Sequence, residues 1–267
     1  MNQLHRLAAH VAGSLVLAFL MLPILAVVPA SFNHASFIKF PPDRLSARWY
    51  DAFLRDSEWY SALFASAQVA LSTTALSLVI GTLAALGLAR TSARWHAALH
   101  ALIISPMIVP VIMTSVALYN VLRPLGLHGT LAGLTLGHTL LALPFVVVNV
   151  GLALRAIEPN CLRAAEGLGA GPMEVFRSIT LPQIVPGLAG GAAFAFITSF
   201  DEVVISIFIA GAQTKTLPVK MWEVIRTEFT PVTAVASTIL IVVTLLLFAV
   251  AKIMSRRQVQ TEVLDAQ

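Results

Sequence analysis

Two adjacent acids, Asp201 and Glu202, are the residues of this chain with the clearest potential for chemistry. They follow a run from Ser178 to Phe200 that contains no charged residue. A helix that begins at Pro182 rises about 28 Å before it reaches Asp201, because each residue adds about 1.5 Å. Such a helix places the acids near the outer boundary of a membrane's hydrocarbon, where a carboxylate is costly unless it faces a cavity or a cation.

The acids predict an anionic wall of a translocation path or, alternatively, a helix-end ion pair or side chains that snorkel to the interface. Successive helix residues point about 100° apart, so the two acids cannot face one lumen equally well. Because Asp201 directly follows the charge-free Ser199 and Phe200, we expect it to contribute more than Glu202 to a site that attracts cations.

Other reactive patterns are missing from the sequence. It has no G-x-x-x-x-G-K-[ST] phosphate loop, H-E-x-x-H or G-x-S-x-G motif, so we predict no catalytic residue, metal site or cofactor of its own. His100 and His138 lie in apolar stretches and are interpreted as packed, hydrogen-bonded residues. The single cysteine, Cys161, cannot form an intramolecular disulfide. The net charge of +4 has no basic run behind it, so nucleic acid is not an expected partner.

The composition is that of a membrane protein. Of the 267 residues, 58% are hydrophobic and only 11% are charged, and the mean hydropathy is +0.85. Soluble domains carry about 25% charged residues. The surface of this chain must therefore meet the lipid bilayer.

Six apolar stretches are long enough to cross a bilayer as helices, which takes about 20 residues. We predict an all-α integral membrane protein with a single domain, 1–267. The expected spans are 11–30, 60–89, 97–122, 131–154, 182–207 and 231–252. Prolines predict kinks in the first, third and fourth spans, at Pro23, Pro106, Pro110 and Pro144. The first stretch exceeds the usual length of a cleaved signal peptide and is interpreted as a retained helix.

The basic residues favour one orientation. Arg90 and Arg94 form a short basic connection, and Arg256 and Arg257 lie in the tail. Basic connections close to helix ends stay in the cytoplasm. We therefore expect both termini inside.

The connection 155–181 has the pattern of two short helices. Leu162, Ala165 and Leu168 fall on one face at helical spacing, Gly169 to Gly171 interrupt the pattern, and a second helix is expected from Pro172 to Ile179. Two amphipathic helices at a membrane surface indicate a protein partner.

The same loop resembles the motif shared by permease subunits of ABC importers, which reads E-A-A, three residues, G, nine residues, I-x-L-P. Every interval matches, although Arg163 replaces the glutamate and Glu166 lies about one turn further on. The matching residues are Arg163, Ala164, Ala165, Gly169, Ile179, Leu181 and Pro182. The resemblance implies a type I (MetI-like) permease fold whose coupling helices, in this loop, sit in a groove of a cytoplasmic ATPase.

Four further stretches are similar to the second permease of spermidine and putrescine importers: LSARWYDAF from Leu45, GTLAALGLAR from Gly81, LPFVVVNV from Leu143 and SFDEVVISIFIAG from Ser199. The resemblance implies a bacterial inner-membrane protein with a substrate path that includes Trp49, Ser199, Asp201 and Glu202. It also implies a second homologous permease subunit, two cytoplasmic ATPase subunits that bind ATP and Mg, and a periplasmic or extracellular substrate-binding protein.

The ligand and one other class of transporter stay open. In SPMIVP, Met107 stands where polyamine permeases commonly have an aspartate, which suits an amino acid or opine about as well as a polyamine. An ion-coupled secondary carrier would require inverted repeats, and an intramembrane enzyme would require convergent ligands or a nucleophile with a base. Neither pattern is found in the sequence.

Overall fold

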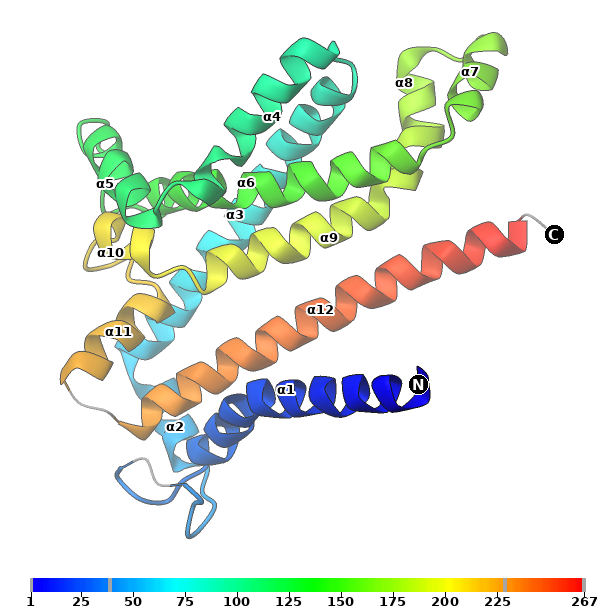
Figure 1. Cartoon of the computed structure of the whole chain (residues 1–267). Helices are drawn as coiled ribbons and strands as arrows, with labels where there is room; N and C mark the ends of the chain where they lie inside the picture. Colours follow the sequence, from blue (N-terminus) through cyan, green and yellow to red (C-terminus); the bar gives the residue numbers. More distant parts are fainter. Residues whose placement is uncertain (1, 38–39, 228–229, 266–267) are drawn as a thin grey trace. The chain divides into compact units, whose positions relative to one another are not determined.

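The computed structural model describes residues 2–37, 40–227 and 230–265, which form helices joined by loops (Figure 1). The helices are α1 (Asn2–Ser31), α2 (Arg48–Arg55), α3 (Ser57–Ala89), α4 (Ala93–Ile108), α5 (Val111–Leu122), α6 (Leu131–Ala156), α7 (Pro159–Gly167), α8 (Pro172–Val175), the π-helical turn η1 (Phe176–Thr180), α9 (Leu181–Phe200), α10 (Val204–Ile209), α11 (Leu217–Thr227) and α12 (Pro231–Asp265).

Five helical segments of the described chain are long and apolar enough to cross a membrane. They are His10–Ser31, Ser57–Ala89, Leu131–Ala156, Pro172–Phe200 and Pro231–Lys252. The bent pair α4 and α5 makes six if it is counted as one span. An all-α membrane protein of about six spans is therefore confirmed.

The predicted third span, 97–122, is not one straight helix. α4 and α5 meet at an angle of 102°. Val109 between them is extended, with φ −70° and ψ 132°, as expected for a residue that precedes a proline. Pro110 has no N–H to continue the helix, so the break falls at one of the four prolines that predicted kinks. α1 and α6 continue as helices past two others, Pro23 and Pro144.

The predicted fifth span, 182–207, is also interrupted. α9 ends at Phe200, Asp201 to Val203 are not helical, and α10 begins at Val204. The acids thus lie at a junction between two helices and not within one helix.

The chain divides into two compact units, residues 1–61 with 220–243 and residues 62–219 with 244–267. In the first unit, the buried Phe53 of α2 packs on Trp59 with ring centroids 5.6 Å apart. Lys220 of α11 forms an ion pair with Glu58 at the start of α3.

The second unit is built on α6 and α9, which lie side by side in Figure 1. Small residues let their backbones approach, as is common for helices in membranes. A Cβ on Gly187 of α9 would lie 2.7 Å from the Asn149 carbonyl oxygen of α6, and a Cβ on Gly191 would lie 3.1 Å from the Val146 Cα. Close packing of these two helices fixes the position of the end of α9 relative to α6.

α10 packs against the N-terminal part of α6. Its buried residues Ile205 and Ile209 belong to an apolar cluster with Val69 of α3, Leu122 of α5 and Leu134 of α6. A Cβ on Gly137 of α6 would lie 2.9 Å from Ile205 Cγ2. The short helix is therefore held by tertiary contacts, since six residues alone would not form a stable helix.

Candidate functional site

The α9–α10 junction separates the two adjacent acids. The Asp201 N–H donates to the Ile197 carbonyl oxygen at 3.2 Å and so completes the last turn of α9. The side chain of Asp201 is exposed, whereas that of Glu202 is buried. Among the described residues, no cation forms an ion pair with Asp201.

Glu202 stabilises the start of α10. Its carboxylate accepts hydrogen bonds from the Ile205 N–H at 2.7 Å and the Ser206 N–H at 3.0 Å. These N–H groups belong to the first turn of α10 and have no partner within that helix. A carboxylate in this place satisfies them and compensates its own burial.

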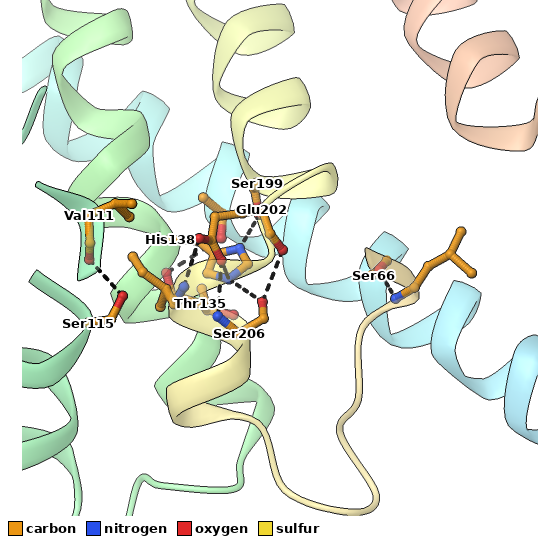
Figure 2. A network of polar contacts seen from close by, with 11 residues as sticks. Ser66, Val111, Ser115, Thr135, His138, Ser199, Glu202 and Ser206 are labelled. Carbon is orange, nitrogen blue, oxygen red and sulfur yellow. Dashed lines mark hydrogen bonds and ion pairs between the residues drawn. The ribbon is translucent and has the colours of Figure 1, made fainter. Parts of the chain in front are cut away.

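His138 of α6 reaches the same junction (Figure 2). Its Nδ1 lies 2.8 Å from the Ser199 hydroxyl of α9, and its Nε2 lies 3.0 Å from the Ser206 hydroxyl of α10. The same Nε2 is 3.4 Å from Glu202 Oε2. His138 is thus a buried, hydrogen-bonded residue, as interpreted from the sequence.

We refer to His138, Ser199, Glu202 and Ser206 as the His138 network. All four side chains are buried, with exposed fractions between 0% and 8%. Ser199 and Glu202, both assigned to the substrate path from the sequence, are therefore brought together in this network. Sequence reasoning missed the role of Ser206 and the link to His138. Ser199 and Ser206 are 61 and 68 positions from His138, so no local pattern joins them to it.

Trp49, the fourth residue assigned to the substrate path, belongs to the other unit. It lies on α2 and is half-buried. Its indole N–H donates to the Ala35 carbonyl oxygen at 3.2 Å, and the Arg48 guanidinium lies 4.4 Å from the centroid of its ring. The indole is thereby fixed against the loop that follows α1.

The predicted coupling loop forms the short helix α7, as its pattern indicated. The second helix begins at Pro172 as expected but does not end at Ile179, because α8, η1 and α9 form one helical segment that continues to Phe200. α7 ends in a left-handed turn at Gly169, which has φ +89°. The Gly169 N–H donates to the Glu166 carbonyl oxygen and the Ala170 N–H to the Ala165 carbonyl oxygen, both at 3.0 Å. This is the Schellman pattern of helix termination, which favours glycine.

The surface of the coupling loop is exposed. Leu168 at the tip is 89% exposed and Met173 is 61% exposed. A hollow of about 330 Å³ lies beside them and is lined by Ala165, Leu168, Gly169, Ala170, Glu174, Val175, Ser178 and Ile179. Arg163, Ala164, Glu166 and Pro182 are also exposed, while Leu181 is half-buried. Apolar side chains that meet water around a hollow are typical of a surface that binds another protein.

The structure shows no site for a metal ion in the part of the chain that it describes. There, no three His, Cys, Asp or Glu side chains lie close enough together to hold one.

The chain matches one known protein family over more than half of its length. Residues 77–260 match the family described as binding-protein-dependent transport system inner membrane component, a range that holds more than half of the chain. The chain belongs to this family. It is accordingly a multi-pass inner-membrane component of a transport system that depends on a binding protein.

Two curated relatives match nearly the whole chain. The spermidine/putrescine transport system permease protein PotC of Haemophilus influenzae is 28% identical over 242 residues, which cover 91% of this chain and 94% of that protein. The putrescine transport system permease protein PotI of Escherichia coli K12 is 31% identical over 250 residues, which cover 91% of this chain and 89% of that protein.

Solved structures show the same fold. A bacterial ABC transporter that imports the acidic polysaccharide alginate has a chain that matches with a TM-score of 0.71 and 15% identity, covering 94% of this chain and 96% of that one. A chain of the MetNI methionine ABC transporter matches with a TM-score of 0.64 and 20% identity, covering 74% of this chain and 94% of that one. The predicted MetI-like permease fold is therefore confirmed.

Proposed function

We propose that this chain forms half of the translocation path of an ABC importer for a small cationic amine such as spermidine or putrescine. A second homologous permease subunit would form the other half. Two cytoplasmic ATPase subunits would bind ATP and Mg, and a periplasmic or extracellular binding protein would deliver the ligand. Family membership supports the type of system, and the two relatives named for spermidine or putrescine support the ligand class.

The observation that carries the ligand class is the exposed carboxylate of Asp201 beside the end of α9. The last turn of α9 adds the negative end of the helix dipole, which favours a cation at this place. An acid at membrane depth that faces neither a partner cation nor the protein interior requires water or a cationic ligand. An ammonium group that passes the junction would supply that charge.

An amino acid or opine is the second candidate ligand, because Met107 stands where polyamine permeases commonly have an aspartate. Its side chain is 50% exposed at the end of α4, where an aspartate would add a second anion. One carboxylate matches one ammonium group, which amino acids and opines also carry. Two anions would match a diamine or polyamine better.

An uptake assay tests the ligand class. The complete transporter with its binding protein is reconstituted in liposomes that contain ATP, and uptake of radiolabelled putrescine, spermidine, lysine and glutamine is compared. We expect saturable, ATP-dependent uptake of putrescine or spermidine that an excess of glutamine does not inhibit. Uptake of an amino acid without uptake of either amine would show that the ligand is of the second class.

The orientation of the chain is part of this proposal. Both termini and the loop α7–α8 would lie in the cytoplasm, where the ATPase subunits are. Cys161 of α7 is exposed and reports the side of that loop. A membrane-impermeant thiol reagent should label inside-out vesicles, stripped of ATPase subunits, and not intact spheroplasts. Labelling of intact spheroplasts at the same rate as of vesicles would reverse the orientation.

A further inference from the structure

The His138 network joins the two sides of the α9–α10 junction through a single ring. Ser199 lies in the last turn of α9 and Ser206 in the first turn of α10, so the two hydroxyls flank the acids. His138 contacts one hydroxyl with each ring nitrogen, at 2.8 Å and 3.0 Å. In a neutral imidazole one nitrogen donates and the other accepts, and a serine hydroxyl can take either role. A rigid ring with partners on both sides fixes the distance between the two helices.

The network also holds the carboxylate of Glu202 in a buried position. The carboxylate of Glu202 accepts two N–H groups of α10 and lies 3.4 Å from His138 Nε2. It is 8% exposed, whereas its neighbour Asp201 is exposed. Because the two residues are adjacent in a junction of three residues, the direction of Asp201 depends on how Glu202 and the two serines are held.

We propose that His138 is a positioning residue that clamps the α9–α10 junction and so sets the place of the Asp201 carboxylate. This rests on the proposed role of Asp201 in the translocation path. His138 itself is 1% exposed, so its ring is not accessible to a ligand in the path. Its effect on transport passes through Asp201.

A residue that only fills space beside α9 would behave differently. Replacement of a space-filling residue lowers stability wherever it lies, but it does not act on one neighbouring side chain in particular. Thr139 provides the matched control. It follows His138 on α6, it is 7% exposed, and its hydroxyl donates to Thr135 of its own helix at 2.6 Å.

The test measures the position of residue 201 directly. The full transporter is prepared with Cys161→Ser and Asp201→Cys, and the rate at which a small methanethiosulfonate reagent modifies the thiol is compared for His138→Gln and Thr139→Val. We expect His138→Gln to change the rate of modification by about fivefold. The free energy of one buried hydrogen bond shifts the equilibrium between two positions of residue 201 by about that factor. Thr139→Val should leave the rate within about twofold, because its hydroxyl bonds only within α6. Equal rates in all variants, or equal changes for both substitutions, would overturn the proposal.

Serine variants keep the test decisive if His138→Gln does not assemble. Ser206→Ala and Ser199→Ala each remove one end of the clamp and should each change the rate of modification of residue 201. If His138→Gln does assemble, Ser206→Ala should add little to its effect, because residues that act through one network are not additive. Full additivity, or unchanged rates in both serine variants, would contradict the clamp.

The thiol reaction requires no transported ligand. If amine uptake fails but the rates change as expected, the proposed ligand is wrong and the clamp stands. If amine uptake succeeds and the rates do not change, only the clamp is wrong.

Discussion

The coupling loop and the α9–α10 junction are held by opposite means. In the coupling loop, the turn at Gly169 is closed by backbone hydrogen bonds to residues three and five positions earlier, and Leu168 and Met173 beside it are exposed. At the junction, the side chains of His138, Ser199, Glu202 and Ser206 are buried and bond one another across three helices. In the proposed function the loop presents a surface to a partner, while the junction sets the place of one carboxylate. Substitutions in the loop should therefore affect coupling to ATP hydrolysis, and substitutions at the junction should affect passage of the ligand.

The largest effect on uptake is expected from Asp201, one of the two acids of the junction. Asp201→Asn should lower amine uptake by about 5- to 150-fold, since the loss of an anion that pairs with a partly desolvated cation costs about 1 to 3 kcal/mol. The melting temperature of the complex should not fall, because the carboxylate is exposed and no cation among the described residues forms an ion pair with it. Uptake and thermal unfolding are measured in the same preparations.

Glu202→Gln is the matched variant for this prediction. The amide nitrogen cannot accept the Ser206 N–H, so one buried hydrogen bond is lost and the melting temperature should fall. Its uptake should fall less than that of Asp201→Asn when equal amounts of assembled complex are compared. The reverse order, with Glu202→Gln the more damaging for uptake and harmless to stability, would exchange the roles of the two acids.

A smaller effect is expected from the turn of the coupling loop. Gly169 and Gly167 both have open space where a Cβ would lie, but only Gly169 has a positive φ. Gly169→Ala should cost about 1 kcal/mol, because the left-handed conformation is unfavourable for alanine. Stimulated ATP hydrolysis should fall by up to about fivefold, with ligand capture by the binding protein unchanged.

Gly167→Ala is the control, since it adds the same methyl group to a helical residue, where alanine is favoured over glycine. It should leave stimulated ATP hydrolysis at the original rate. If Gly169→Ala hydrolysed ATP and transported as well as Gly167→Ala, the shape of this turn would not matter for coupling.

The smallest effect concerns Met107. Met107→Asp should raise the ratio of spermidine to putrescine uptake by about 1.4- to 5-fold, since an exposed pair of charges contributes about 0.2 to 1 kcal/mol. Met107→Asn controls for polarity without charge. An equal change in both variants, or no change in Met107→Asp, would show that the charge at position 107 does not affect selectivity. Charge selectivity would then depend on the junction.

The sequence alone determined the features that depend on neighbouring residues. The apolar lengths predicted about six spans, the prolines predicted a kink in the third, and the glycines at 169–171 predicted the end of the first short helix of the coupling loop. Each of these depends on composition, on a proline or on a helix cap, and all of those act within a few residues. The motif in the coupling loop was also sufficient to predict the family.

Tertiary structure decided how the acids are divided. From its apolar pattern, the fifth span was expected to continue to residue 207, yet the helix ends at Phe200. Helical spacing indicated that the two acids could not face one lumen equally well, but it could not show that Glu202 caps α10, because that requires the break. His138 meets Ser199 and Ser206 only because close packing of α6, α9 and α10 brings together residues 61 and 68 positions apart. Hydropathy records how apolar a segment is and not which buried polar side chains will satisfy each other, so this network was decided by the packing of the helices.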